Sequence, residues 1–271
     1  MSNTNLVNGI SGQWKNSYGS LMTIQQFSNG LVWGTYSSTT GSSGTYMVLG
    51  FSPYNASGNQ PISLCIYWKN TKGGPPDPTW NWVSMMCGQL LTDAPSGPQL
   101  ELLHSMIASG PFNAVDVYGP GAYTETLVFA PYTSPVAVDL SQSNPFENKK
   151  ELVNALNGQW VNKSTNSNFP TLNLITYSNP PLVDGTLYTP EQAIMIGGLY
   201  NADAMTGTLQ TIAITGIYND KNGNNAAVSM GGFYDPLKSE LELITFKSIM
   251  TTYDAKYACT NILGGEHFVK K

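Results

Sequence analysis

The chain has 271 residues and a formal net charge of −5, carried by 12 Lys and 17 acidic residues, and it contains no Arg. Only 11% of its residues are charged, against roughly 25% in an average soluble protein. Arg is the usual bidentate ligand for phosphate, so an acidic chain without Arg is not expected to bind nucleic acid. The apolar runs are too short to span a membrane.

Cysteine and histidine are scarce. The three cysteines (Cys65, Cys87 and Cys259) form neither a disulfide framework nor a CxxC pair, and only His104 and His267 could add metal ligands. We therefore expect no metal and no cofactor. The first residues, MSNTNLVNG, lack the basic and apolar regions of a secretory signal. A cytoplasmic location is expected, although a processed secreted chain would look the same.

The first half of the chain predicts a series of β-strands. Apolar and polar residues alternate with a period of two, and clusters of Gly, Asn, Pro and Ser interrupt them every 8–12 residues or so, as in all-β proteins. The predicted strands lie near Gly12–Asn16, Ser20–Phe27, Leu31–Ser38, Gly44–Phe51, Ile62–Trp68, Val83–Leu91, Gln99–Ile107 and Thr124–Ala130. Eight strands joined by short loops are typical of an up-and-down barrel, whose interior can hold one small ligand.

A linker follows at residues 131–155. It ends in the segment NPFENKKELVNAL, in which Asn144 can cap a helix and Pro145 fits its first position. Glu147 completes the spacing of a capping box. We expect one short helix here and little helix elsewhere.

The second half of the chain repeats the first. Four segments return in the same order: Asn8–Asn16 at Asn154–Asn162, Val32–Ser38 at Val183–Thr189, Ile66–Asn70 at Gly216–Asp220, and Gln99–Met106 at Glu240–Lys247. An ordered set of matches indicates duplication. The predicted fold class is therefore all-β, with two tandem eight-stranded antiparallel up-and-down barrels. We expect the barrels at residues 8–130 and 156–271.

The order of short motifs in the first copy resembles that of the avidin/streptavidin family. These motifs are GQWKN followed by GS, then GTYSS, YWKN and GQ, and a late strand. The resemblance implies an avidin-like barrel that binds the bicyclic ring of biotin. In that family an Asn, a Ser and a Tyr donate hydrogen bonds to the ureido oxygen, and the matching residues here are Asn16, Ser20 and Tyr36.

The resemblance also assigns the rest of the pocket, with departures. Ser38 matches a hydroxyl that accepts from a ureido N–H, Thr40 lies in the closing loop, Trp68 matches an aromatic wall and Ser84 replaces a Thr. Two further aromatic walls fall at Met86 and Ser105, and the family's carboxylate falls at Tyr123. Losing aromatic rings costs on the order of several kcal/mol of burial. We therefore expect reduced affinity for biotin, or a different ligand with a carbonyl head.

The second copy departs further. Asn162 is kept, but the Ser position falls in a longer turn, where Ser167 or Thr171 are the candidates, and Leu187 replaces the Tyr. The resemblance places Tyr218 and Phe246 as aromatic walls and Glu266 at the carboxylate position. The donor set is broken at Leu187, so this site is either lost or retuned.

Several of these residues have simpler interpretations. Asn16 and Ser20 also fit an ordinary Asx-type turn, and only their presence together with Tyr36, Ser38 and Trp68 favours a cavity.

The remaining candidates are given structural roles. His104 precedes the supposedly inward Ser105, so we expect it to point outward and pack. Glu266 and His267 are adjacent in a strand and should face opposite sides. Cys65 and Cys87 are expected at outward positions as small apolar fillers. Trp80 and Trp82 would brace a loop or cover a pocket.

The sequence thus predicts a small-molecule-binding protein, with biotin or another carbonyl- or ureido-bearing ligand in the N-terminal barrel. The two copies are expected to pair as a pseudo-dimer, and further pairing of two chains is left open. One alternative is a cofactor-free cyclase that uses the barrel cavity. Another is a lectin-like or defence protein with loops such as Thr79–Trp82 on its surface. Hydrolysis is not expected, because neither GxSxG nor a Ser-His-Asp set is apparent.

Overall fold

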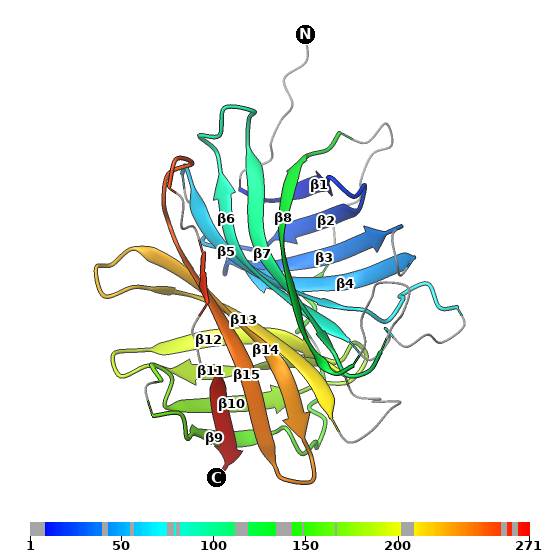
Figure 1. Ribbon diagram of the computed structural model, residues 1–271, viewed down its shortest axis with the longest axis vertical. Helices are drawn as coiled ribbons and strands as arrows, with labels where there is room; N and C mark the ends of the chain where they lie inside the picture. The colour runs from blue at the N-terminus through cyan, green and yellow to red at the C-terminus, as the bar shows by residue number, and fades with distance from the viewer. Residues whose placement is uncertain are drawn as a thin grey trace.

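The described part of the chain is built from β-strands. The computed structural model describes residues 9–39, 43–54, 57–74, 79, 82–111, 119–133, 143–147, 149–165, 167–201, 209–255, 259–261 and 265–271. In these residues there is no α-helix, and no helix that could cross a membrane. The chain forms two barrels, one above the other in Figure 1.

The first barrel is a closed antiparallel sheet in which each strand pairs with the next and β8 returns to β1. Its strands are β1 (Gly12–Asn16), β2 (Leu21–Gln26), β3 (Leu31–Ser38), β4 (Gly44–Phe51), β5 (Gln60–Tyr67), β6 (Val83–Leu91), β7 (Gln99–Ala108) and β8 (Gly121–Pro131). The bounds of β1, β3, β4 and β6 coincide with the prediction, and the others differ by a few residues at their ends.

The second barrel repeats this architecture. Its strands are β9 (Gly158–Asn162), β10 (Thr171–Thr176), β11 (Leu182–Tyr188), β12 (Ala193–Tyr200), β13 (Gln210–Asn219), β14 (Asn225–Asp235), β15 (Glu240–Ile249) and β17 (Glu266–Lys270). It closes through the pairings of β14 with β15, β15 with β17 and β17 with β9, and the short β16 (Cys259–Asn261) pairs with β15. The tandem double-barrel prediction is confirmed.

The repeated Gly-Gln-Trp segment has the same structural role in both barrels. Trp14 and Trp160 are 1% and 0% exposed. Each indole N–H donates to a carbonyl four residues earlier, Ile10 O and Leu156 O, at 2.9 Å in both cases. Because a buried indole needs a partner for its N–H, this contact fixes the start of each barrel.

A glycine in each third strand allows two strands to approach closely. A Cβ at Gly34 would lie 1.9 Å from Thr23 O, and one at Gly185 would lie 1.9 Å from Asn173 O. Only glycine fits such an approach. The repeated Val-x-Gly-Thr segment is therefore a requirement of the small barrel rather than of a ligand.

The expected linker helix is not present in the described part of the linker. Residues 145–147 form a single turn, in which Asn144 Oδ1 accepts from the Phe146 N–H at 3.0 Å. The capping signal at Asn144 is thus used, but by a turn. Phe146 packs edge-on against Tyr177 at 6.0 Å, and Glu151 forms a β-bridge with Tyr177. These contacts hold the chain in an extended path instead of a helix.

The barrels pack flank to flank through the outer faces of β4–β7 and β12–β15. Cys65 and Cys87 are outward and fully buried at this contact, which agrees with their predicted orientation. Ser63 Oγ donates to Gly216 O across it at 3.1 Å. Strands β5 and β6 are consequently buried on both faces. The predicted pairing of the two copies within one chain is observed.

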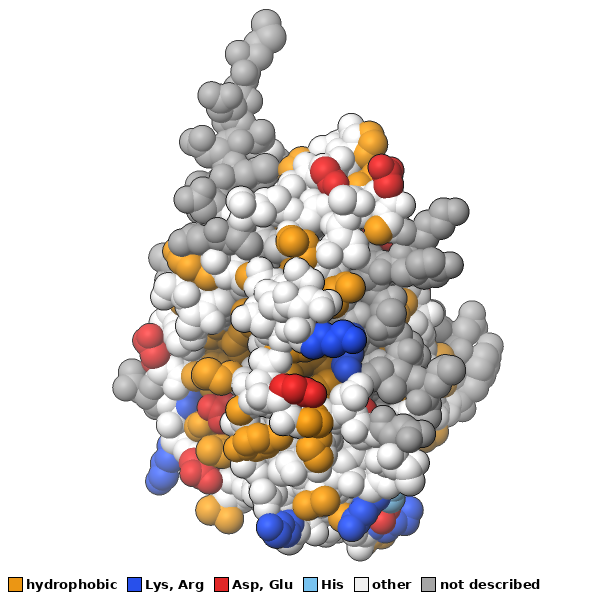
Figure 2. Space-filling model, turned by 90° about the vertical axis from the view of Figure 1, so that its left-hand side faces the viewer, with side chains coloured by type: hydrophobic (Ala, Val, Ile, Leu, Met, Phe, Trp, Pro, Cys, Tyr) orange, Lys and Arg blue, Asp and Glu red, His pale blue; other side chains and the backbone are white. Residues whose placement is uncertain are grey.

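The exposed face in Figure 2 carries few charged side chains, which are scattered among uncharged ones. This agrees with the low overall charge content of 11%. No large field of one sign is visible on this face.

Candidate functional site

The hairpin between β1 and β2 places Asn16 and Ser20 at one end of the first barrel. Gly19 adopts a φ of 86°, and its N–H donates to Asn16 O at 3.0 Å, which makes a tight turn. Asn16 Oδ1 accepts from the Ser20 N–H at 2.9 Å. Both side chains are buried, at 5% and 1% exposure. Asn16 therefore closes the turn through its side-chain oxygen, and both Asn16 and Ser20 are nevertheless buried inside the barrel.

Tyr36 receives the hydrogen bonds that this hairpin offers. Its hydroxyl oxygen accepts from Asn16 Nδ2 at 3.4 Å and is also hydrogen-bonded by the side chain of Ser20. Burial raises the pKa of the Tyr36 hydroxyl, while the contacts with Ser20 and Asn16 partly offset this rise. The hydroxyl therefore keeps its proton at neutral pH. The hydroxyl oxygen thus accepts from Asn16 and lies in contact with the Ser20 hydroxyl, in a buried polar cluster at one end of the barrel.

Aromatic rings form the wall next to Tyr36. Trp68 lies edge-on to Tyr36 with ring centroids 6.0 Å apart, and its ring is tilted against Tyr46 at 4.8 Å. All three belong to the buried cluster inside the barrel. Trp68 therefore lies inside the barrel beside Tyr36, together with Tyr46, and its role as a wall for a ligand stays a prediction.

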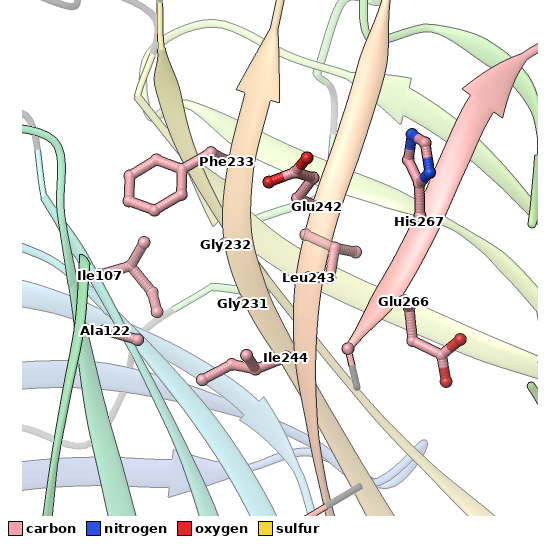
Figure 3. Close-up of a pocket in the computed structure, with 11 residues that line it drawn as sticks. Ile107, Ala122, Gly231, Gly232, Phe233, Glu242, Leu243, Ile244, Glu266 and His267 are labelled. Atoms are coloured by element: carbon pink, nitrogen blue, oxygen red, sulfur yellow. The ribbon is translucent and has the colours of Figure 1, made fainter. Parts of the chain in front are cut away.

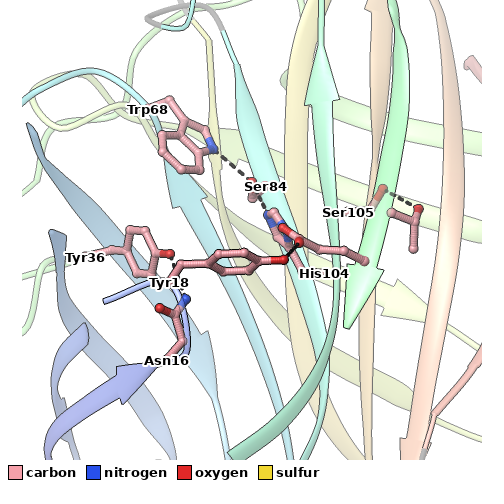
Figure 4. Close-up of polar contacts among 9 residues, drawn as sticks. Asn16, Tyr18, Tyr36, Trp68, Ser84, His104 and Ser105 are labelled. Carbon is pink, nitrogen blue, oxygen red and sulfur yellow. Dashed lines mark hydrogen bonds and ion pairs between the residues drawn. The ribbon is translucent and has the colours of Figure 1, made fainter. Parts of the chain in front are cut away.

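A chain of polar contacts continues from Trp68 around the barrel (Figure 4). Trp68 Nε1 donates to Ser84 Oγ at 2.8 Å, and Ser84 Oγ lies 2.8 Å from His104 Nε2. His104 Nδ1 lies 3.2 Å from Glu125 Oε1, and the Tyr18 hydroxyl donates to Glu125 Oε2 at 3.3 Å. The contacts lead from Trp68, directly after β5, through β6, β7 and β8 back to the β1–β2 hairpin.

These contacts encircle one end of the first barrel. The hydrogen bond to His104 is the largest of the effects that hold the pKa of Glu125 below its usual value, and the Tyr18 bond adds to it, while burial opposes them. Glu125 is half-exposed, with 44% of its side chain accessible. The network therefore runs from the buried Ser84 to the surface.

The other predicted ligand residues of the first barrel divide into three groups. Ser38 and Met86 face the interior, on the same strand faces as Tyr36 and Ser84. Tyr123 packs against the interior cluster from β8, and its hydroxyl donates to Gly119 O at 2.7 Å. Thr40 lies outside the described residues.

The predicted orientations of Ser105 and His104 are wrong. Leu100 and Leu102 belong to the interior cluster, so His104 faces inward with them and Ser105 faces outward. Ser105 is buried, and its hydroxyl accepts from Thr124 at 3.1 Å, outside the barrel. A one-residue error in strand register exchanges every inward and outward side chain.

Phe246 carries the same error in the second barrel. It belongs to the cluster between the barrels, whereas Leu241 and Leu243 face the interior of the barrel. Phe246 is therefore part of the interface and not an aromatic wall. Trp82, expected in a loop or over a pocket, is 1% exposed and packs inside the first barrel, and Trp80 lies outside the described residues.

Sequence reasoning missed four members of this site: Tyr18, Tyr46, His104 and Glu125. The alternation within Gln99–Ala108 did carry a signal, because Leu100 and Leu102 share the face of His104. Glu125 falls on the same face of its strand as Leu127 and Phe129. Because Glu125 and His104 lie on the inner faces of neighbouring strands, this pattern could have predicted that they form a pair.

The second barrel uses its repeated Asn differently. Asn162 Nδ2 shares its two hydrogens among three acceptors, Ser167 Oγ at 2.9 Å, Phe169 O at 3.1 Å and Glu266 Oε2 at 2.6 Å. Its Oδ1 accepts from the Ser164 N–H at 2.8 Å. The amide is therefore engaged by its own turn and by Glu266. With Leu187 in the interior cluster, no hydroxyl occupies the place of Tyr36.

Tyr218 and Glu266 both face the interior of the second barrel. Tyr218 packs against the interior cluster, and burial raises its pKa to about 12. Glu266 is 2% exposed, while His267 lies on the outer side, 3.6 Å from Glu240 Oε1. The opposite orientation of these two neighbours agrees with the prediction.

Three comparisons relate the chain to known proteins. Residues 5–101 match the family model described as "Avidin family", so the predicted resemblance is confirmed for the first barrel. Two solved structures are similar. A rhizavidin–biotin complex has 20% identity and a TM-score of 0.36, and the match covers 48% of this chain and 100% of that chain. A structure of rhizavidin has 19% identity and a TM-score of 0.37, and the match covers 50% of this chain and 92% of that chain. Among curated proteins there is no significant match.

Proposed function

We propose that the N-terminal barrel, which matches the avidin family, binds a small molecule through a carbonyl or ureido oxygen. The observation that carries this proposal is the buried polar cluster of Asn16, Ser20 and Tyr36, in which Asn16 Nδ2 donates to the Tyr36 hydroxyl and both hydroxyl groups can donate to a ligand oxygen. Buried donors of this kind favour an acceptor oxygen over water, because they are already oriented. Trp68 and Tyr46 supply the apolar wall beside it.

Biotin is the first ligand to test, and we expect its affinity to be modest. The aromatic positions replaced by Met86 and by the inward His104 reduce the apolar sleeve. Each 1.4 kcal/mol of lost burial weakens binding about tenfold. A dissociation constant on the order of micromolar is therefore expected for biotin, compared with much tighter values when every wall is aromatic.

Titration calorimetry with biotin tests this function. Asn16→Ala should weaken binding, because it removes a bond to Tyr36 and loosens the hairpin. Asn162→Ala is the matched control, since it changes the equivalent position of the second barrel and should leave biotin binding unchanged. Absence of heat at high biotin concentration would exclude biotin, and equal effects of the two variants would place the ligand elsewhere.

Ester hydrolysis is a second candidate, favoured by one observation. Ser84, His104 and Glu125 are connected in the order hydroxyl, imidazole and carboxylate. Ser84 Oγ could attack an ester carbonyl while His104 Nε2 takes its proton and returns it to the leaving alcohol. Ser84 is, however, 0% exposed and accepts from Trp68, so binding is the better supported function. Release of p-nitrophenol from p-nitrophenyl acetate, lost in Ser84→Ala but kept in Ser105→Ala, would support hydrolysis.

A further inference from the structure

A pocket lies outside both barrel interiors, where three parts of the chain meet. Its volume is about 550 Å³, within the range of roughly 300–1,000 Å³ that is usual for small-molecule sites, which often lie between domains. The first barrel, the linker and the turn between β10 and β11 each contribute a wall. The described residues that line it belong to neither interior cluster. The pocket is therefore separate from the site of the first barrel.

The hydrogen bonds of Asn70, in the wall from the first barrel, fix which end of its amide is available. Asn70 Oδ1 accepts from the backbone N–H of Thr45 at 3.2 Å and from that of Lys72 at 3.1 Å. A backbone N–H can only donate, so the amide atom that it contacts must be the oxygen. The Nδ2 group, with its two hydrogens, is the end of this side chain that is left for a ligand.

Asn154, in the wall from the linker, is oriented in the same way. Its Oδ1 accepts from the backbone N–H of Leu156 at 3.0 Å. This bond also assigns the oxygen to the turn and leaves the Nδ2 group for a ligand. Two segments that are far apart in the sequence thus each bring an amide N–H donor to the lining of one pocket.

The pocket carries positive charge in a protein whose net charge is −5. Lys69 is part of its lining, and the Lys149 ammonium group donates at 2.7 Å to the backbone oxygen of Asn179, another lining residue. The described lining contains no Asp or Glu. Donors together with positive charge favour an anionic oxygen acceptor. Because Met47 and Leu152 add an apolar wall, the pocket suits an organic anion better than an inorganic one.

A second cleft between the barrels has the opposite charge. Its volume is about 450 Å³, and its walls include Ile107 and Ala122 from the first barrel and Phe233, Glu242 and His267 from the second. Figure 3 shows the Glu242 carboxylate turned toward the side of Phe233. An anion placed in this cleft would meet a like charge, which disfavours binding. The cleft is therefore an internal control for the pocket at Asn70.

We propose that the pocket between the first barrel, the linker and the β10–β11 turn binds a small organic monocarboxylate. Its oxygens accept from the Nδ2 groups of Asn70 and Asn154, and Lys69 supplies the compensating charge. The apolar body of the ligand lies against Met47 and Leu152. One ammonium group in the described lining matches a single negative charge, and a chain without Arg lacks the usual bidentate ligand for phosphate. The inference does not depend on the ligand of the first barrel.

Three probes of similar shape test this site in the full chain at pH 7. Benzoate is an anion, benzamide is neutral and benzamidine is a cation. Methyl NMR of labelled methionines locates binding, because Met47 lines the pocket and Met86 lies inside the first barrel. Met85 reports on the acidic cleft, since a Cβ at the lining residue Gly231 would lie 2.9 Å from Met85 Sδ. We expect benzoate to shift the Met47 signal saturably, benzamide to do so more weakly and benzamidine not at all.

Substitutions of Asn by Asp make the test specific. Asn70→Asp and Asn154→Asp each keep the oxygen that closes the turn but replace the donor with a charged acceptor. Each should weaken benzoate binding about tenfold or more. Asn29→Asp is the matched control, because Asn29 Oδ1 accepts from the Leu31 N–H in a turn of the first barrel outside the pocket lining, and it should bind benzoate like the wild type. Lys69→Gln should weaken binding severalfold and is the further variant if an Asp variant fails to fold by circular dichroism.

Several results would overturn the proposal. They are the absence of a Met47 shift with benzoate, equal binding of benzamide or benzamidine, and wild-type affinity in the folded variants at Asn70, Asn154 and Lys69. Benzoate shifts at Met85 or Met86 in place of Met47 would also overturn it. None of these results affects the proposal for the first barrel, which biotin titration tests separately.

Discussion

At the scale of single residues, Asn16 performs two functions with one amide. Its oxygen accepts from the Ser20 N–H and closes the turn, and its nitrogen donates to the Tyr36 hydroxyl. The turn interpretation and the pocket interpretation of this residue are therefore compatible. Its counterpart Asn162 also closes a turn, but donates to Glu266 instead of a tyrosine.

Tyr36→Phe should weaken ligand binding while leaving the barrel folded. The variant removes the buried donor, whose hydrogen bond to a ligand oxygen contributes about 1–1.5 kcal/mol, or roughly five- to tenfold in affinity. Calorimetry with biotin measures the change. Tyr188→Phe, in which the hydroxyl is on the exposed outer side of the second barrel, is the control and should bind like the wild type. Unchanged affinity in Tyr36→Phe would remove this hydroxyl from the site.

Glu125 should make the stability of the protein depend on acidic pH. Because His104 and Tyr18 lower its pKa in the folded state, Glu125 stabilises the fold above the pKa of the unfolded chain, about 4.3. This contribution is lost as the pH falls through the lower folded pKa. Urea unfolding of Glu125→Gln should therefore show a loss of stability at pH 7 that largely disappears near pH 3. An equal loss at both pH values would contradict the ionic role of Glu125.

At the scale of elements, strand positions were predictable and strand orientation was only partly so. The alternation of apolar and polar residues predicted all eight strands of the first barrel, and the Gly, Asn, Pro or Ser residues in each loop predicted where the strands end. The error at β7 lay in its orientation, because the resemblance placed Ser105 on the inner face that Leu100 and Leu102 share with His104. The alternation at Leu100 and Leu102 indicates the inner face in the first half of β7, whereas the second half is buried on both faces near the other barrel and gives no such signal.

The β1–β2 hairpin should be sensitive to its glycine. Gly19 has a φ of 86°, and a Cβ added there would meet nothing within 4 Å, so Gly19→Ala introduces backbone strain without a clash. We expect a loss of about 1 kcal/mol in the free energy of unfolding and weaker ligand binding, because Asn16 and Ser20 shift. Gly119→Ala, also in open space but outside the left-handed region, is the control. Equal melting temperatures for the two variants would argue against a strained turn.

At the scale of the whole molecule, duplication has produced two barrels with a shared interface and different interiors. The repeated segments that survived are those that build the barrel, such as Gly-Gln-Trp and the third-strand glycine. Leu187 stands in the second barrel where Tyr36 stands in the first. Asn16 pairs with Phe129 and Asn162 with Phe268, so Glu266 takes the place of Leu127. The similarity between the two halves of the sequence therefore predicted the two barrels. The polarity of each barrel interior depends on residues that differ between the halves, so the similarity did not predict it. The contact between the barrels was predictable only from the resemblance, because small apolar residues such as Cys65 and Cys87 occur both in barrel cores and at interfaces between barrels.

The buried interface predicts inert thiols. Cys65 and Cys87 lie between the barrels, and burial raises the pKa of the Cys65 thiol strongly. In a Cys259→Ser background we expect the native chain to show almost no reaction with Ellman's reagent, because the thiolate is both rare and inaccessible. The two remaining thiols, Cys65 and Cys87, should react after unfolding in guanidinium. Rapid labelling of the native chain would mean that the barrels separate in solution.

The number of biotin molecules bound per chain decides whether the first barrel alone holds the ligand, and native mass spectrometry at a biotin concentration near the dissociation constant of that barrel measures it. Only the first barrel has an Asn, a Ser and a Tyr together, at Asn16, Ser20 and Tyr36, so we expect one biotin per chain and none in Asn16→Ala at the same concentration. Two biotin molecules per chain, or one that persists in Asn16→Ala, would contradict it.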